Sequence, residues 1–251
     1  MKISIFLITY NEETQIERTL NTLKWADEIV VVDGGSNDRT AEICKRFPVF
    51  FYTRKFDSFD CQKNYALSKT SNEWVLSIDA DEIVSPELSK EILEVINENR
   101  PDDGFTVLRQ NIFLNRPLRF GGQGMERVLR LFRKSKGKFW GHVHETVHID
   151  GPVGHLSGVL IHNSIPTLKE YYRKLVLYTD MESVSVVEEN RVPNFIMALL
   201  GPPIKFVLNY VIKGGFLDNK EGFLYHALSC CYGWIRNFKA YRLLIRKRKK
   251  H

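Results

Sequence analysis

The segment Glu28–Asp33 constrains the fold most, because Ile29, Val30, Val31 and Val32 are apolar without interruption. A strand with one solvent-exposed face alternates polar and apolar residues, whereas a strand covered by helices on both faces is apolar throughout. Further short strands are predicted at 3–9, 49–53 and 74–79, with helices at 13–23, 38–46, 59–68 and 86–96 between them. This alternation predicts an α/β fold with a mostly parallel sheet.

The pattern changes after Arg100-Pro101. Strands are predicted at 105–109, 127–133 and 153–161, and Gly-rich or basic turns separate them, which indicates mixed strands added to the sheet. Helical spacing returns at Thr167 with Tyr171, Leu175 and Tyr178. We therefore expect an α/β domain over residues 1–165 and a helical region over residues 166–251.

Composition narrows the class of protein. With 43% hydrophobic and 26% charged residues among 251, the chain can bury a core and is not generally disordered. Its four cysteines form no CxxC pair, and two of them are the adjacent Cys230 and Cys231. This usage favours reduced thiols and a cytoplasmic setting. Residues 1–6 indicate a strand rather than a signal peptide.

The C-terminal region is apolar and then basic. Between 193 and 235 the apolar residues are interrupted by Lys205, Lys213 and the segment Gly201-Pro202-Pro203, so no uncharged stretch reaches the roughly 20 residues of a spanning helix. Eight Lys and Arg and no acid follow between Trp234 and His251, in a chain of net charge +6. We expect short amphipathic helices on an anionic membrane surface. The alternative is a helical subdomain packed on the α/β domain.

Three carboxylates follow the predicted strand at 74–79. Asp79, Asp81 and Glu82 stand close together in Asp79-Ala80-Asp81-Glu82. Neighbouring carboxylates repel and raise each other's pKa values. A divalent cation offsets that repulsion and commonly also holds phosphates. The segment therefore predicts a metal–diphosphate site, although acidic residues are also common in ordinary loops.

Two other polar clusters follow predicted strands, at Thr9–Glu13 and at Asp33–Ser36. Ligands of open α/β sheets bind beyond the carboxyl ends of the strands, so the three clusters predict one cleft for a nucleotide. The chain has neither a Walker A motif nor GxGxxG, and a glycine-rich phosphate loop is not the device here.

The same segments resemble a known family. Residues 9–13, 32–40 and 79–82 are similar to the signatures of family 2 glycosyltransferases, which have the GT-A fold. Residues 126–133 and 141–145 resemble bacterial lipopolysaccharide-core β-1,4-glucosyltransferases, and residues 213–218 resemble the membrane-proximal end of that subfamily. The resemblance implies an inverting transfer of a sugar, with glucose favoured, from a UDP-sugar to a lipopolysaccharide-core or other lipid-linked acceptor. It also implies Mg²⁺ or Mn²⁺ and a peripheral position on the inner face of the cytoplasmic membrane.

The resemblance assigns roles on the donor side. Thr9, Tyr10, Asn11 and Glu12 would line the nucleoside pocket, Asp33 would accept a hydrogen bond from the base, and Lys63 and Asn64 would face the nucleotide. Asp79 and Ala80 would contact the donor as well. Asp81 would be the more direct metal ligand, Asp79 would lie nearer the ribose or a metal-bound water, and His162 would be a further ligand. A lone histidine after an apolar strand is alternatively structural.

Roles on the acceptor side follow in the same way. An inverting transfer needs a base for the acceptor hydroxyl, and Glu145 in Gly141-His142-Val143-His144-Glu145 is the candidate. His142, His144, Arg127 and Arg130 would bind the acceptor. Alternatively, Glu145 is an ordinary surface acid and the arginines form a solvated strand face. Gly121–Gly124 is either a mobile loop over the site or a simple hairpin connection.

Two other functions remain open from the residues alone. A nucleotidyltransferase would share the metal and the nucleotide, but it would need a lysine-rich loop near the first strand, where Asn11-Glu12-Glu13 is acidic. A basic protein that binds nucleic acid or membrane without catalysis would use the C-terminal charges. We expect no nucleic-acid partner, because these charges are terminal and their neighbours are apolar. Salt-sensitive retention on RNA or DNA without UDP binding would favour the nucleic-acid reading.

Overall fold

A computed structural model describes residues 1–98, 100–141 and 146–248. The chain divides into two compact units. The sheet unit comprises Met1–Gln110 and Glu126–Asn163, and the helical unit comprises Asn111–Met125 and Ser164–His251. Residues 111–125 thus group with the C-terminal helices, although no pattern in the sequence separates them from the predicted α/β domain.

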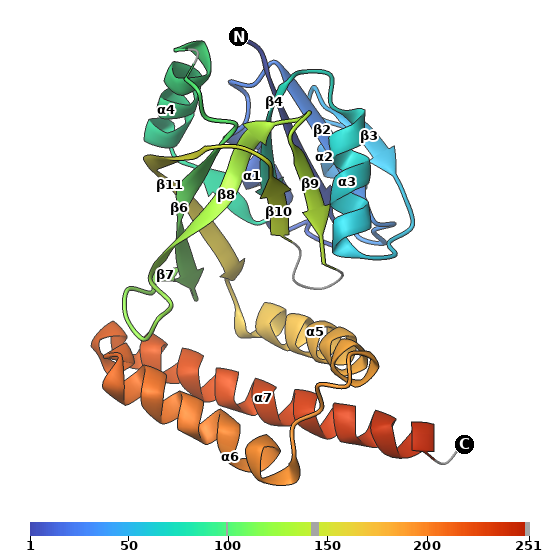
Figure 1. The fold of residues 1–251 in the computed structure, drawn as a ribbon, viewed down its shortest axis with the longest axis vertical. Coiled ribbons are helices and arrows are strands. Elements are labelled where there is room, and N and C mark those ends of the chain that lie inside the picture. The colour runs from blue at the N-terminus through green and yellow to red at the C-terminus, as the bar shows by residue number, and fades with distance from the viewer. Residues whose placement is uncertain (99, 142–145, 249–251) are drawn as a thin grey trace. The chain divides into compact units, whose positions relative to one another are not determined.

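The sheet unit is built on a mostly parallel sheet with antiparallel additions (Figure 1). Strands β1 (Ile3–Thr9), β2 (Glu28–Asp33), β3 (Phe50–Thr53) and β4 (Trp74–Asp79) lie in the order β3-β2-β1-β4 and pair in parallel. The order continues with β8 (Met125–Arg133), β6 (Gly104–Phe113), β11 (Val153–Ile165) and β5 (Glu82–Val84). The β4–β8 and β11–β5 pairs are antiparallel. The predicted α/β, GT-A-like fold is confirmed.

Four helices connect these strands: α1 (Ile16–Asn21), α2 (Thr40–Cys44), α3 (Phe59–Lys69) and α4 (Pro86–Asn97). Ser58 and Ser85 cap α3 and α4, because each hydroxyl group accepts a hydrogen bond from the backbone N–H three residues later. Asp38, where the predicted helix at 38–46 starts, accepts from Thr40 N at 2.9 Å, and α2 begins only at Thr40. Asp38 therefore shapes the turn before the helix.

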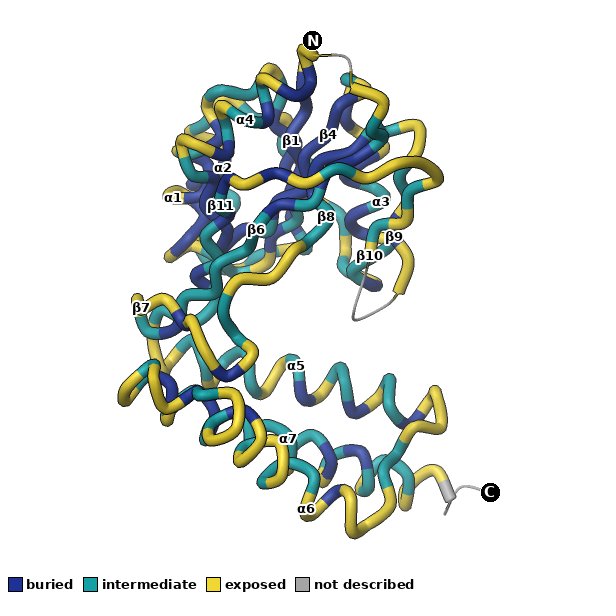
Figure 2. The backbone as a smooth tube through the Cα atoms, turned by 60° about the vertical axis from the view of Figure 1, so that its left-hand side comes forward, coloured by how far each residue is buried: buried dark blue, intermediate teal, exposed yellow. Residues whose placement is uncertain are grey.

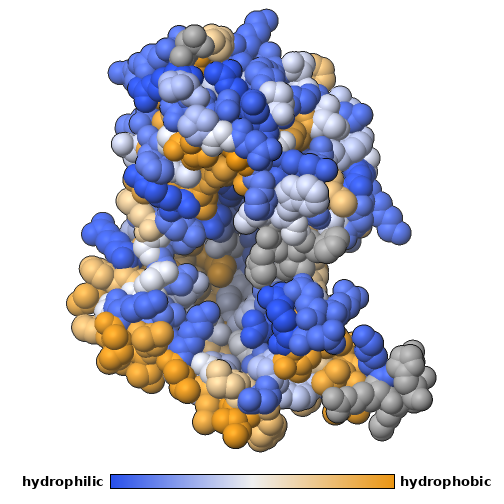
Figure 3. All heavy atoms as spheres, in the orientation of Figure 1, coloured by the Kyte–Doolittle hydropathy of each residue, from blue (hydrophilic) through white to orange (hydrophobic). Residues whose placement is uncertain are grey.

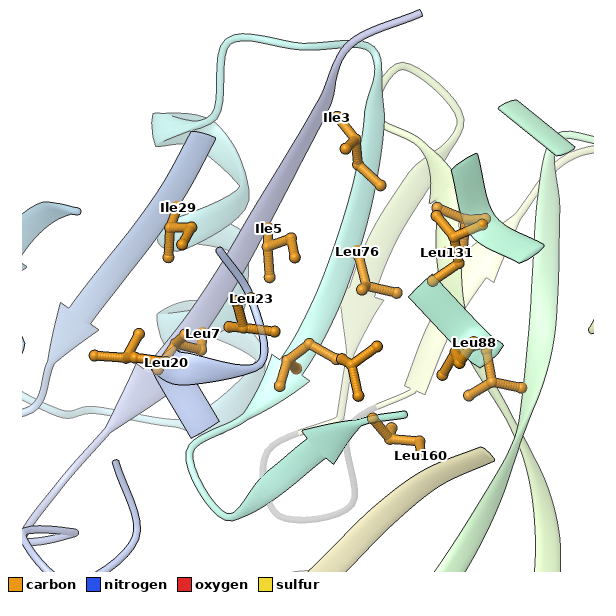
Figure 4. Close-up of a cluster of buried hydrophobic side chains, with 14 of the residues drawn as sticks. Ile3, Ile5, Leu7, Leu20, Leu23, Ile29, Leu76, Leu88, Leu131 and Leu160 are labelled. Carbon is orange, nitrogen blue, oxygen red and sulfur yellow. The ribbon is translucent and has the colours of Figure 1, made fainter. Parts of the chain in front are cut away.

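The main core of the sheet unit joins one face of the sheet to its helices (Figure 4). Ile5 and Leu7 of β1 lie beside Leu23 and Leu20, and Ile3 of β1 and Leu88 of α4 belong to the same cluster. A second cluster around Phe6, Val32 and Phe132 covers the other face. Burial on both faces explains why β1 and β2 are apolar without alternation, as Figure 2 shows along β1.

Several short strands were not predicted. β5 directly follows the acidic segment, β9 (Gly137–Trp140) and β10 (Thr146–Ile149) form a two-stranded antiparallel sheet, and β7 (Arg116–Pro117) pairs with the end of β6. Each has at most four residues. Runs this short carry little periodicity, so tertiary pairing rather than local pattern determines them.

The helical unit contains α5 (Leu168–Glu188), α6 (Phe195–Phe206), the π turn η1 (Val207–Ile212), the 3₁₀ turn η2 (Gly215–Asp218) and α7 (Asn219–Arg248). The predicted break at Gly201-Pro202-Pro203 is wrong, because α6 continues through both prolines. Prolines in a helix leave the carbonyl groups four residues earlier without their usual donors. Here Asn237 Nδ2 donates to Ala198 O at 3.1 Å, and Trp234 Nε1 donates to Leu199 O at 2.9 Å. Side chains of α7 thus replace the two lost hydrogen bonds.

The continuous segment Phe195–Ile212 has consequences for the membrane prediction. Over the described residues it is one helix of 18 residues that is long and apolar enough to cross a membrane by length and composition, and 17% of it is buried. The expectation of only short helices is therefore wrong for this segment and for α7, which has 30 residues. Much of α6 is exposed in Figure 2, and hydrophobic side chains gather over the helical unit in Figure 3.

Candidate active site

The register of three parallel strands brings the predicted polar clusters to one edge of the sheet. Thr9 pairs with Asp33, and Ile8 pairs with Asp79. β1, β2 and β4 therefore end side by side, and the loops that follow them emerge at the same edge. This is the position where open α/β sheets bind ligands.

The loops after β1 and β2 are tied together by backbone-to-side-chain hydrogen bonds. Asn11 N donates to Ser36 Oγ at 2.8 Å, and Asn37 N donates to Asn11 Oδ1 at 2.9 Å. Glu12 N donates to Thr40 Oγ1 at 2.8 Å. Asn11 has a φ of 54°, a left-handed conformation that Asn tolerates better than most residues. The two predicted clusters thus form one preformed rim.

Asp33 organises the turn on this rim. Its carboxylate is 2% exposed and accepts from Gly35 N at 3.0 Å and from Ser36 N at 2.8 Å through Oδ2. Oδ1 accepts from Ser36 Oγ at 2.5 Å. Next to it, Thr9 is buried and Tyr10 is 44% exposed. The predicted nucleoside residues therefore lie together.

A buried network of charges surrounds the end of β4. Asp79 Oδ1 lies 2.8 Å from Lys63 Nζ, and Asp79 Oδ2 lies 2.6 Å from Arg130 Nη2. The same Arg130 nitrogen lies 2.5 Å from Glu82 Oε1, and Arg109 Nη1 is 3.4 Å from that oxygen. Asp79 and Glu82 thus share three cationic side chains, which limits the carboxylate repulsion expected from sequence.

The network keeps Asp79 ionised. Burial opposes its charge, but the charges of Arg130 and Lys63 hold the pKa of the carboxyl well below its usual range. Burial likewise opposes the charge of Arg130, whose pKa is nevertheless raised by Asp79 and Glu82. Lys63 is buried beside Asp79, as a donor-side residue should be. Arg130 is buried as well and faces the acidic segment, a placement that offers an acceptor little surface.

The strand β5 brings His162 to the acidic segment. In the β5–β11 register Glu82 pairs with His162, and Asn163 N donates to Asp81 O at 3.0 Å. His162 Nε2 lies 3.4 Å from Asp81 Oδ1. Burial lowers the pKa of His162, but the neighbouring charge of Asp81 outweighs it and the net pKa is raised. The negative surroundings that favour the imidazolium also attract a metal cation.

These donors fit a divalent metal that shares its coordination with a substrate. Within the described residues no group of three or more His, Cys, Asp or Glu is placed to hold a metal by itself. Mg²⁺ sites for nucleotides typically use one or two carboxylates together with substrate phosphates and water. Asp81 and His162 supply one hard oxygen and one imidazole, while Asp79 is already bonded to Lys63 and Arg130.

Buried polar atoms without partners gather at the same edge. Within the described residues, Thr9 Oγ1, Arg130 Nε and Asn163 Oδ1 are buried and make no hydrogen bond. Each belongs to a residue at the end of β1 or bonded to the acidic segment. Buried polar groups in native proteins are nearly always satisfied, so unpaired ones here indicate where a ligand completes the bonding.

Other predicted residues serve the framework. Asn64 exchanges two hydrogen bonds with the backbone of Phe139, at 2.9 and 3.0 Å, and thereby ties α3 to β9. Ala80 O accepts from Thr19 Oγ1 at 2.8 Å. Arg127 is exposed, and its guanidinium donates to Leu156 O at 3.1 Å. The predicted base Glu145 and the predicted acceptor residues His142 and His144 lie outside the described residues.

Sequence reasoning missed residues that support the site from a distance along the chain. Gln15 Nε2 donates to Asn163 O at 2.8 Å across 148 positions, and Arg109 joins the acidic network from β6. Asn163 follows His162 directly in the sequence. Its hydrogen bond to Asp81 forms where β11 pairs with β5, a strand that was not predicted. A polar residue after an apolar strand run was the available signal.

Comparisons with known proteins identify the family of the chain. The family model described as glycosyl transferase family 2 matches residues 4–151. The lipopolysaccharide core biosynthesis glycosyltransferase LpsC of Rhizobium meliloti is 28% identical over 250 residues, covering 96% of this chain and 93% of LpsC. The uncharacterized glycosyltransferase RP128 of Rickettsia prowazekii is 29% identical over 241 residues, covering 87% and 82%.

A solved structure is also similar at low identity. The crystal structure of TarS residues 1–349 of S. aureus in complex with UDP-GlcNAc has a TM-score of 0.48 and 16% identity, and the match covers 97% of this chain and 92% of that one. The family match, in contrast, spans more than half of the chain and includes all three strand-end clusters. It decides between the two enzyme readings in favour of sugar transfer. The chain belongs to the family 2 glycosyltransferases and is an enzyme of that family.

Proposed function

We propose that this enzyme transfers a sugar, with glucose favoured, from a UDP-sugar to a lipopolysaccharide-core or other lipid-linked acceptor, with inversion at the anomeric carbon. The family match supports the transfer, and similarity to LpsC over nearly the whole chain supports the acceptor class. The choice of UDP and of glucose rests on the sequence resemblance.

The donor is held at the carboxyl edge of the sheet. Thr9 Oγ1 and the remaining lone pairs of the Asp33 carboxylate bind the nucleoside, beside the exposed ring of Tyr10. Lys63 and Arg130 fix the ionised Asp79, so that it accepts a hydrogen bond from the ribose without moving. Asn11 and Glu12 contribute through the rigid rim they share with the loop after β2.

Asp81 and His162 would hold Mg²⁺ or Mn²⁺ in this proposal. The bound cation would neutralise charge that develops on the departing diphosphate. Arg130 Nε, which is unpaired among the described residues, offers a further hydrogen bond at the same place. We therefore propose that Arg130 positions the donor side, instead of the acceptor role first predicted for it.

Transfer also requires removal of a proton from the acceptor hydroxyl. We assign this step to Glu145, which lies in sequence between β9 and β10. The acceptor oxygen bonds to the anomeric carbon as the bond from that carbon to the diphosphate oxygen breaks, and the proton passes to the Glu145 carboxylate. His142, His144 and Arg127 are proposed acceptor contacts. Asn64 supports this segment by fixing Phe139 in β9.

The helical unit is proposed to hold the enzyme at the inner face of the cytoplasmic membrane. Exposed apolar residues are concentrated on α6 and η1, where Phe195, Ile196 and Ile212 are 72%, 65% and 72% exposed. Exposed Arg242, Arg246 and Lys247 follow on α7. Apolar burial combined with attraction of basic residues to anionic lipid is the usual basis of interfacial binding. We keep the peripheral mode as the proposal, with insertion of Phe195–Ile212 as its alternative.

The observation that carries the proposal is the Asp81–His162 pair beside the unpaired buried atoms. We expect Asp81→Ala to abolish Mn²⁺-stimulated release of UDP from a UDP-sugar, while the thermal midpoint stays near that of the wild type. Asp150→Ala, which alters an exposed carboxylate in a different segment, is the matched control and should retain release. Metal-stimulated release by folded Asp81→Ala would overturn the assignment.

A further inference from the structure

A groove of about 590 Å³ lies within the helical unit. One wall comes from β7 and the segment after it, and the other comes from the junction between η2 and α7. The lining residues are Arg116, Pro117, Arg119, Phe120, Leu217, Asp218, Asn219, Lys220 and Glu221. None of them has been given a role in sugar transfer.

The two walls are joined by hydrogen bonds, so the groove is preformed. The Asp218 carboxylate accepts from Arg119 N at 3.0 Å and from Phe120 N at 2.9 Å, across about 100 positions of sequence. Gly121 N donates to Lys213 O at 3.0 Å. Gly121 has a φ of +66°, and a Cβ there would lie 2.2 Å from His226 Nε2, so only glycine fits. The loop predicted to be mobile is thus anchored to the helices.

The charges in the groove favour an anion. Arg116, Arg119 and Lys220 are exposed, and in the described part of the chain their side chains form no ion pair. Asp218 also lines the groove, but its carboxylate is engaged by the two backbone N–H groups. Glu221 is half-buried. Arginine in particular binds phosphate through two parallel hydrogen bonds.

Apolar side chains border these cations. Phe120 is 40% exposed and Leu217 is 52% exposed, and both line the groove. Phe216, next to Leu217, is 50% exposed. A soluble phosphate compound has no hydrocarbon to contact these apolar side chains, whereas a lipid presents a phosphate directly beside hydrocarbon. The combination of cations and exposed apolar residues therefore points to an amphiphile.

We propose that this groove binds the phosphate of a lipid headgroup. Arg116, Arg119 and Lys220 contact the phosphate, and Phe120 and Leu217 contact the hydrocarbon next to it. The phosphate belongs either to a phospholipid of the bilayer or to the lipid-linked acceptor, since both present the same chemistry. The inference rests on the proposed membrane location of the helical unit and adds a defined headgroup site to it.

The test compares vesicles that contain phosphatidic acid with vesicles that contain phosphatidylglycerol, adjusted to equal surface potential. We expect the full-length enzyme to bind the phosphatidic acid vesicles about tenfold more tightly, since a phosphomonoester accepts more charge-assisted hydrogen bonds. The groove variant Arg116→Gln/Arg119→Gln/Lys220→Gln should lose this preference. Flotation at several lipid concentrations measures both affinities.

The matched control removes three exposed charges elsewhere, in Arg242→Gln/Arg246→Gln/Lys247→Gln. This variant should bind both kinds of vesicle more weakly and yet keep the preference, because bulk attraction does not distinguish headgroups. A groove variant that keeps the preference, or a wild type that has none, would overturn the proposal. Circular dichroism of both variants establishes that each is folded.

A second arm identifies the source of the phosphate. Transfer is measured with a lipid-linked acceptor extracted from membranes, before and after phosphatase treatment. A KM about tenfold higher for the treated acceptor, absent in the groove variant, assigns the site to the acceptor. An unchanged KM with a lost vesicle preference assigns it to the bilayer. UDP release without acceptor tests the donor site separately, so failure of the proposed function does not resemble failure of the groove.

Discussion

In the sheet unit charged side chains are buried and paired, whereas in the helical unit large apolar side chains are exposed. Glu82 is 0% exposed and Arg130 is 6% exposed, and both belong to one ionic network. On α6 and η1, by contrast, Phe195 and Ile212 are each 72% exposed. Either feature is costly in water when it has no partner: an uncompensated buried charge destabilises the fold, and a large exposed apolar patch promotes association.

The difference concerns how each unit compensates its unfavourable groups. The buried charges around Asp79 and Glu82 are paired with one another, and three of the unpaired buried atoms among the described residues lie at the edge proposed to bind the nucleotide. On α6 and η1, the large apolar residues stay exposed to solvent. The proposed membrane location would cover them, because a lipid surface has the matching chemistry. Substitutions that separate these two situations test the comparison directly.

The largest effect is expected from Glu145→Gln, which removes a proton acceptor and keeps the size of the side chain. Transfer should fall by roughly 10²–10⁴-fold if Glu145 is the base. The affinity for UDP should remain, since the proposed donor contacts lie at the ends of β1, β2 and β4. Single-turnover transfer and UDP titration measure the two quantities. A parallel loss of UDP affinity would place Glu145 in the donor site instead.

A large effect of another kind is expected from Arg130→Met. Among the described residues, the substitution leaves the buried Glu82 with the more distant Arg109 as its one ion-pair partner, at 3.4 Å. Removing one partner of a buried ion pair typically lowers the free energy of unfolding by about 3–5 kcal/mol. Urea denaturation measures the change.

The control for Arg130 lies on the same strand. Arg127→Met removes an exposed arginine of β8 that donates to a backbone carbonyl, and it should change stability far less. If both variants lose the same free energy of unfolding, the buried ion pairs of Arg130 stabilise the fold no more than the exposed Arg127 does. The contrast between the two units would then weaken.

The fold of the sheet unit was predictable because local pattern and tertiary structure agree there. The apolar run at Ile29–Val32 and the start of the helix at Pro86 lie where the sequence indicates. The meeting of Thr9, Asp33 and Asp79 followed from the parallel arrangement alone. Strand ends in such a sheet converge whatever the details of the loops.

The remaining features depend on contacts between distant segments. The three residues of β5 have no periodicity to detect, yet their pairing with β11 brings His162 to Asp81. Arg130 looked like part of a basic strand face, because nothing local indicates that Asp79 and Glu82 neutralise it. The continuous α6 was missed for a similar reason, since Trp234 and Asn237 compensate for Pro202 and Pro203 from another helix.

In the helical unit, unlike at Arg130, substitution of exposed apolar residues should weaken membrane binding and hardly change stability. Ile196→Ser/Ile204→Ser alters two side chains that are 65% and 59% exposed. Burying each isoleucine side chain in a bilayer would contribute about 1.5–3 kcal/mol to binding. Vesicle affinity of the double variant should therefore fall on the order of 100-fold or more. The free energy of unfolding in solution should change by only about 0.5 kcal/mol per site.

The matched control for these isoleucines is Val187→Ser on α5, where the side chain is 7% exposed. It should lower the free energy of unfolding and leave the vesicle affinity of the folded protein unchanged. If Ile196→Ser/Ile204→Ser instead destabilises the protein as strongly as Val187→Ser does, the α6 face is covered by protein in solution. The membrane assignment would then fail, and an oligomer contact would replace it.

The smallest effect, without consequence for activity, concerns the cysteines. Burial raises the pKa of Cys44 in the sheet unit to about 12, with a further contribution from Asp33, whereas Cys231 on α7 is exposed. Only the thiolate reacts with iodoacetamide, so the raised pKa alone lowers the thiolate fraction of Cys44 roughly 1,000-fold at pH 8. Cys231 should be alkylated within minutes in the native protein, while Cys44 should react only after urea unfolds the sheet unit. Peptide mass spectrometry at successive times follows both sites, and the exposed Cys61 is the control within the sheet unit. Native alkylation of Cys44 at the rate of Cys61 would show that the buried side of α2 opens readily, and the contrast between a closed sheet unit and an open helical surface would not hold.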